Sequence, residues 1–151
     1  MLGEIKAWLE QGGEASSTEE ARLAAAALLV EAAHVAGGLD PRERVAVDGV
    51  LERRFGLSPA AARQLAASAE QAAEHSAQLF HFTQVINDRF SIEQRIELME
   101  MLWEVVYADG TIDALEDTLL RRIGGLLYVP DRERGAARLR VLQRLGGRRQ
   151  P

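Results

Sequence analysis

The residues best suited to chemistry in this sequence form one short acidic stretch, residues 109–116, with the sequence DGTIDALE. Hard divalent cations such as Ca²⁺ and Mg²⁺ are held by several oxygen ligands that converge on one point. Asp109, Asp113 and Glu116 would supply carboxylates from a tight turn between two helices, and Thr111 would add carbonyl and hydroxyl oxygens. The stretch is therefore a candidate site for calcium or magnesium.

The spacing within this stretch matches one half of a known calcium-binding loop. Gly110, Ile112 and Glu116 stand where the second half of an EF-hand loop has its turn glycine, its apolar anchor and its closing glutamate. The first half does not match, because Val105 and Tyr107 occupy the two upstream ligand positions. A bound cation would therefore need further ligands from elsewhere in the chain or from water.

Helix capping explains the same residues without any ligand. Gly110 would adopt the left-handed conformation that ends one helix. Asp113 would cap the start of the next helix, and Glu116 would complete its capping box. A cation site and a pair of helix caps both follow from this pattern, and both interpretations stay open here.

The sequence offers little for other kinds of catalysis. It has no cysteine and only three histidines, which form no His-x-x-x-His pair. No serine lies in a Gly-x-Ser-x-Gly turn, and no glycine-rich loop could hold a phosphate. We therefore expect that the protein is not an enzyme; the alternative is a metal-assisted hydrolase that uses Asp109, Asp113 and Glu116.

The composition predicts one all-α domain over residues 1–151. Hydrophobic residues make up 47% of the chain but aromatic residues only 5%, so that the core must consist mainly of alanine and leucine. Such a core favours close helix packing, since β-sheets use more β-branched and aromatic residues. The pattern of caps and apolar stripes predicts helices over residues 2–10, 17–36, 40–55, 58–75, 79–87, 91–108, 113–127 and 131–145, followed by a frayed tail.

Charge and hydropathy narrow the expected partners and the expected location. The net charge is -5, which argues against nucleic-acid binding. No apolar run approaches the length of a membrane span, and the N-terminus has no signal-peptide pattern, so we expect a cytoplasmic protein. The arginine-rich residues 132–149 are interpreted as a solvated helix face; the alternatives are docking to an acidic partner or nucleic acid, or pairing with the acidic loop of a neighbouring subunit.

The chain contains an internal repeat, which predicts two helical hairpins related by a pseudo-two-fold axis. A shift of 73 residues places Gly37 on Gly110, and it aligns the pattern Gly-x-(Leu/Ile)-Asp-x-x-Glu in halves spanning about residues 23–58 and 97–131. Asp40 and Glu43 are then the counterparts of Asp113 and Glu116. The counterpart of Asp109, however, is Ala36, so the first half lacks that carboxylate.

These features resemble a known family. Glu104, the tripeptide Ala108-Asp109-Gly110, Asp113, Glu116 and the repeated hairpin are similar to the TerB family of tellurite-resistance and stress-associated domains, over about residues 23–131. The resemblance implies an all-α bundle of about seven to eight helices. It also implies an acidic cluster that binds a divalent metal, which here comprises Asp109, Asp113, Glu116, Asp40 and Glu43.

The resemblance further implies a scaffold or sensor without established enzymatic activity, associated with stress response or tellurite resistance. Such a module would act through protein partners or self-association. The alternative is a purely structural protein-interaction domain that has no metal site.

Overall fold

The computed structural model describes residues 18–33, 41–75, 79–108 and 114–149 of the chain. These residues form seven helices and no strand: residues 18–33, α2 (Pro41–Phe55), α3 (Pro59–His75), α4 (Leu79–Arg89), α5 (Ile92–Val106), α6 (Ala114–Leu126) and α7 (Asp131–Arg149). The expected all-α fold is confirmed. None of these helices combines the length and the apolar character that a membrane crossing would need.

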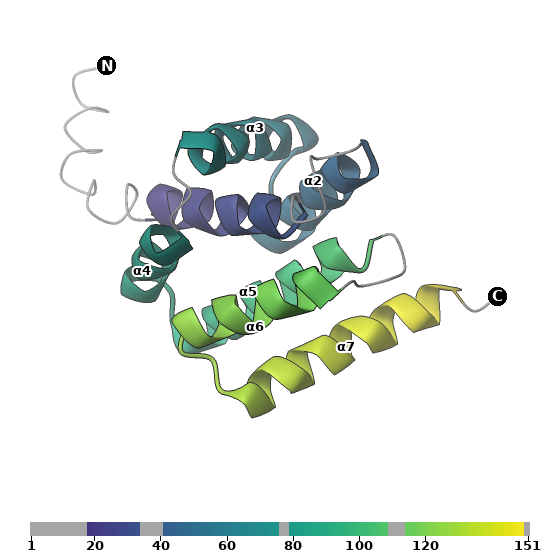
Figure 1. Ribbon diagram of the computed structural model, residues 1–151. Helices are drawn as coiled ribbons and strands as arrows, with labels where there is room; N and C mark the ends of the chain where they lie inside the picture. Colours follow the sequence, from purple (N-terminus) through teal and green to yellow (C-terminus); the bar gives the residue numbers. More distant parts are fainter. Residues whose placement is uncertain (1–17, 34–40, 76–78, 109–113, 150–151) are drawn as a thin grey trace, which may run out of the picture.

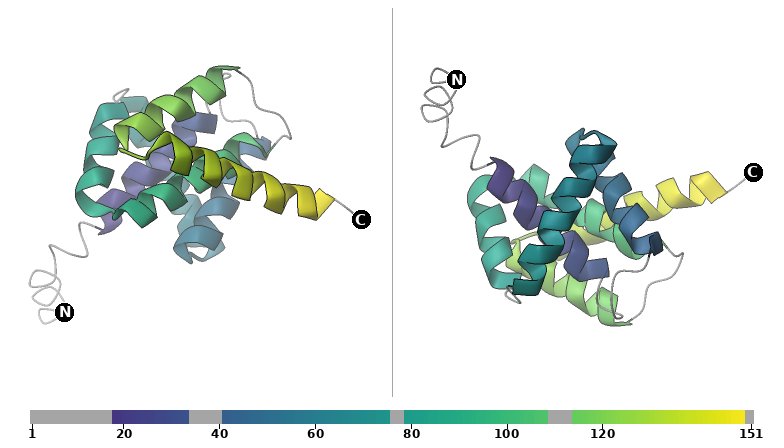
Figure 2. Two further views of the ribbon diagram at one scale, coloured as in Figure 1. Left: turned by 90° about the horizontal axis from the view of Figure 1, so that it is seen from below. Right: turned by 90° about the horizontal axis from the view of Figure 1, so that it is seen from above.

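The helices form two layers that meet at α5 (Figure 1, Figure 2). The helix of residues 18–33 lies with α2 and α3 in one layer, and α5, α6 and α7 make up the other, while α4 flanks one end. α5 contacts α2 in the first layer and α6 and α7 in the second, so it is one of the elements that join the two layers.

The core is built on small and aliphatic side chains, as the composition predicted. Residues 24–30 of the first described helix are buried all round its circumference, as expected of a helix enclosed by others. In α5, the apolar side chains from Leu98 to Trp103 are equally buried. Alanine permits the close approach of the helices, and the few large residues fill the space between them.

Local signals set most of the helix boundaries where they were expected. Ser91 and Gln94 form a complete capping box at the start of α5, and the Ser58 hydroxyl accepts a hydrogen bond from the Ala61 amide at 3.1 Å. Gly56 ends α2 with a φ of 64°, a left-handed conformation that suits glycine. The expected helix over residues 2–10 and the expected cap Asp113 lie outside the described residues.

Two helices extend beyond the ends expected from the sequence. α4 continues to Arg89, and α7 continues to Arg149, whereas a frayed tail was expected from residue 146. The helix passes through Gly146 and reaches Arg149, so the prediction that the tail frays from residue 146 was wrong for residues 146–149.

The order of helices is similar in the two halves of the sequence. The shift of 73 residues carries residues 19–33 onto α5. It carries α2 onto residues 114–128, close to the bounds of α6, and α3 onto residues 132–148, close to the bounds of α7. The packing differs in one respect: α3 packs closely on α2, whereas α7 makes few contacts with α6, the counterpart of α2.

Candidate functional site

The predicted cation ligands are only partly within the described residues. Asp109, Asp113 and Asp40 lie outside them. Glu116 lies in the first turn of α6 and Glu43 in the first turn of α2, and both side chains are half-buried. Within the part of the chain that the structure describes, no three histidine or acidic residues are grouped in a way that could hold a metal ion.

The acidic residues at the start of α6 are placed where a helix favours negative charge. The unpaired amide groups of a helix N-terminus carry a partial positive charge, which carboxylates in the first turn stabilise. Asp117, next to Glu116, also forms an ion pair with Arg121 one turn later at 3.1 Å. The described part of the predicted site is thus compatible with helix capping.

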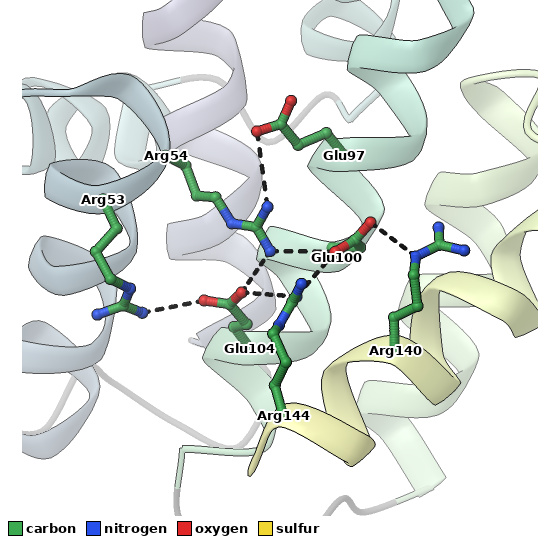
Figure 3. A network of polar contacts seen from close by, with 7 residues as sticks. All are labelled: Arg53, Arg54, Glu97, Glu100, Glu104, Arg140 and Arg144. Atoms are coloured by element: carbon green, nitrogen blue, oxygen red, sulfur yellow. Dashed lines mark hydrogen bonds and ion pairs between the residues drawn. The ribbon is translucent and has the colours of Figure 1, made fainter. Parts of the chain in front are cut away.

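A second group of charged residues, which the sequence did not predict, lies between α2, α5 and α7 (Figure 3). Its members are four arginines and three glutamates, here called the arginine–glutamate cluster: Arg53, Arg54, Glu97, Glu100, Glu104, Arg140 and Arg144. The glutamates come from α5, and the arginines come from α2 and α7. The cluster therefore connects three helices that are far apart in sequence.

Glu104 is held by three arginines. One carboxylate oxygen, Oε1, accepts hydrogen bonds from Arg54 at 2.6 Å and from Arg144 at 3.1 Å. The other oxygen, Oε2, accepts a hydrogen bond from Arg53 at 3.0 Å. Both oxygens are thus engaged with cationic groups, and only 11% of the side chain is exposed.

Glu100 has a similar environment one turn earlier in α5. Its carboxylate accepts hydrogen bonds from Arg54 at 3.2 Å, from Arg140 at 3.1 Å and from Arg144 at 2.8 Å. Glu97 is more exposed and lies 3.7 Å from Arg54. Arg54 and Arg144 each bridge Glu100 and Glu104, which makes them the centre of the cluster.

The arginines keep the two inner glutamates ionised. Burial by itself would raise the pKa of Glu100, but hydrogen bonds from Arg144, Arg140 and Arg54 outweigh it and lower that pKa below its usual value. Burial likewise opposes ionisation of Glu104, and hydrogen bonds from Arg54 and Arg53 bring its pKa below the usual value. In return, these carboxylates raise the pKa of Arg54 despite its desolvation.

The arrangement of the cluster bears on the metal hypothesis. Glu104 belongs to the motif that carries the family resemblance, and in sequence it lies close to the acidic stretch. A metal ion at Glu104 would have to displace arginines whose charge repels it. We therefore interpret Glu104 as a residue that joins α5 to α2 and α7, and not as a metal ligand.

The arginines of α7 are correspondingly not a simple solvated face. Arg140 and Arg144 bind the glutamates of α5, and the Arg138 Nε donates to the Tyr107 hydroxyl at 2.9 Å. Arg138 also lies over the buried Trp103 ring, 5.4 Å from its centroid. A signal was available, since Arg140 and Arg144 are four residues apart, as are Glu100 and Glu104, but periodicity alone does not show which helices face each other.

A cavity of about 230 Å³ between α2 and α3 contains further charged groups. Arg44 and Glu70 form a forked ion pair there, with N–O distances of 3.0 and 3.1 Å. Asp48 and Arg63 also line the cavity; burial raises the pKa of Asp48, while the charge of Arg63 opposes that rise. Positive and negative groups are balanced, so the cavity has no evident preference for an anion or a cation.

Searches of curated proteins and of solved structures found no match. A family model described as tellurite resistance protein TerB matches residues 22–139. The match covers most of the chain, including both halves of the repeat and the acidic stretch. The chain therefore belongs to the TerB family.

Proposed function

We propose that this TerB-family chain is a helical module that binds one divalent cation, Ca²⁺ or Mg²⁺, at the acidic stretch of residues 109–116, and acts as a scaffold for protein partners. The family match carries this proposal, because it spans the whole stretch, including Asp109, Asp113 and Glu116. The half-buried position of Glu116 in the first turn of α6 supports it.

The second half of the chain is the better candidate for the cation. Asp109, Asp113 and Glu116 would contribute the oxygen ligands that hard cations prefer. The first half has Asp40 and Glu43 at equivalent positions, but Ala36 replaces the first aspartate. We therefore propose that Asp40 and Glu43 contribute less than the second-half residues.

Calorimetric titration of the full chain with CaCl₂ and with MgCl₂ tests this proposal. We expect saturable heat for one ion per chain, abolished by Asp109→Ala and strongly weakened by Glu116→Gln. Glu43→Gln is the matched control, because it changes the equivalent first-turn glutamate of α2 and should leave most of the affinity intact. No saturable heat from the unaltered chain, or the same heat from Asp109→Ala, would refute cation binding.

The second candidate function is a purely structural interaction domain. It is favoured by the positions of Glu43 and Glu116 in first turns, where acidic residues stabilise helices without a ligand. Under this alternative, Glu116→Gln would lower the helix stability slightly and change no binding heat. We further propose that the module is not an enzyme. Turnover of a substrate in a phosphoester panel, abolished by Glu116→Gln, would contradict this.

The family name suggests a setting in stress response or tellurite resistance. We propose this setting on the family match alone. If cells that lack the gene are sensitive to tellurite, and the unaltered chain restores resistance whereas Asp109→Ala does not, both the setting and the cation site are supported.

A further inference from the structure

An open apolar groove of about 450 Å³ lies between the first described helix and α3. Leu23, Leu57 and Leu65 form its apolar wall; each packs against the core on one side and remains only partly buried. Glu19, Arg22 and Ser68 lie at its polar border. A groove with an apolar floor and a mixed-charge border is the type of surface that accepts an amphipathic helix.

A contact with α2 helps to position one side of this groove. The guanidinium of Arg22 lies over the Phe55 ring of α2, 5.3 Å from its centroid. The apolar wall comes from three segments: the first described helix, the turn after α2 and α3. In Figure 2, α3 crosses the first described helix, and both belong to the same layer of the bundle.

The chain itself contains a segment that suits this groove. Residues 2–10 carry Leu2, Ile5, Trp8 and Leu9 at helical spacing, and Glu4, Lys6 and Glu10 provide charges of both signs. This segment lies outside the described residues. Burying a tryptophan and three aliphatic side chains of this segment would be strongly favourable.

The connection is long enough to allow the return. The groove includes Glu19 and Arg22, within about one turn of Thr18, where the described chain begins. Residues 11–17 contain Gly12 and Gly13 and can span about 20 Å when extended. A tether of this length gives an effective concentration of about a millimolar, which favours the chain's own segment over a second copy at ordinary protein concentrations.

We propose that residues 2–10 form an amphipathic helix that docks, within the same chain, into the groove lined by Leu23, Leu57 and Leu65. Trp8 and Leu9 would face these leucines, and the charged residues would face solvent. The docked segment would complete the first layer of the bundle, independently of cation binding at the other layer.

Tryptophan fluorescence tests the proposal, because the chain has only two tryptophans. In the full chain with Trp103→Phe, Trp8 is the only tryptophan, and excitation at a wavelength that tyrosine does not absorb selects its emission. Its emission should lie at short wavelength, and its quenching by iodide should be several-fold weaker than for a free tryptophan. Leu65→Gln should shift the emission to longer wavelength and restore quenching, whereas Leu139→Gln, which changes an exposed leucine on α7, should do neither.

A second measurement avoids changes to the core. The chain has no cysteine, so Ser68→Cys at the border of the groove can carry a bimane dye that tryptophan quenches on contact. The dye should be quenched in the full chain and should recover with Trp8→Phe. The same dye at Gln143→Cys, an exposed position on α7, is the control and should not respond to Trp8→Phe.

Either experiment can overturn the proposal. If Trp8 is freely quenched in the folded chain, or if the dye at position 68 ignores Trp8→Phe, the segment does not occupy the groove. If Trp8 protection instead disappears on dilution together with a dimer seen by sedimentation, a second copy fills the groove, and docking within one chain is wrong.

Discussion

Glu104 shows how the meaning of one residue depends on its neighbours in space. By sequence it is an acidic residue close to a candidate cation loop, but the structure places it among Arg53, Arg54 and Arg144. Its carboxylate is 11% exposed, so water screens these interactions less than in a surface ion pair. Removing its charge would leave Arg54, itself only 19% exposed, with fewer compensating groups.

Glu104→Gln should therefore lower the free energy of unfolding by about 2 kcal/mol, less than for a fully buried pair because Arg53 and Arg144 can turn to solvent. The matched control is Glu97→Gln on the same helix, whose carboxylate is 47% exposed and 3.7 Å from Arg54; it should cost at most about 0.5 kcal/mol. Urea denaturation followed by circular dichroism measures both. Equal losses in the two variants would show that burial of the cluster does not matter.

At the scale of elements, α2 and α6 end in the same way but with different residues. After α2, the Leu57 amide donates to the Glu52 carbonyl at 3.1 Å, and after α6 the Val129 amide donates to the Gly124 carbonyl at 3.0 Å. Both turns require a left-handed residue. Gly56 supplies it at no steric cost with a φ of 64°, whereas Tyr128 adopts a φ of 56°.

Tyr128→Gly should raise the free energy of unfolding by about 0.5 kcal/mol, because relief of the left-handed strain exceeds the added backbone entropy of the unfolded chain. Little packing is lost, since the Tyr128 side chain is 73% exposed. Gly56→Ala is the reverse test: the added methyl group meets no atom within 4 Å, so a loss of about 1 kcal/mol would come from φ alone. Denaturation curves that move in the same direction for both variants would contradict this account.

For the whole molecule, the arginine–glutamate cluster makes stability depend on pH. The folded-state pKa values of Glu100 and Glu104 lie below the usual value of 4.5, so the unfolded chain takes up protons first as the pH falls. The stabilisation is complete above the usual pKa and is lost progressively as the pH falls through the folded-state values. Acid should therefore weaken the attachment of α7 to α5 and of α2 to α5.

Denaturation of the unaltered chain at a series of pH values should show a free energy of unfolding that declines below about pH 5. The decline should be shallower in Glu104→Gln, which lacks one of the two groups. Asp48→Asn should not make the decline shallower. Burial raises the pKa of Asp48, although the charge of Arg63 opposes that rise, so protonation of Asp48 favours the folded state. A decline of the same steepness in Glu104→Gln would show that other acidic groups cause it.

Local sequence signals determined most of the helices of this protein. Ser58, Ser91 and Gly56 act on backbone groups within a few residues, and the alanine and leucine stripes have the period of a helix. Such signals need no knowledge of distant residues, so the all-α class and most boundaries followed from them, and the family resemblance followed from a short motif. At Gly146, however, α7 continues to Arg149, and the local pattern of residues did not indicate this.

Only the tertiary structure decided which charged groups meet. Arg54 and Glu100 are 46 residues apart in sequence, and Arg144 and Glu100 are 44 apart, so no spacing rule connects them. Packing of α2 and α7 against α5 brings these charged groups together, and their partial burial then strengthens the ion pairs. For the acidic stretch, by contrast, the chemistry is proposed from the sequence alone, because residues 109–113 lie outside the part of the chain that the structure describes.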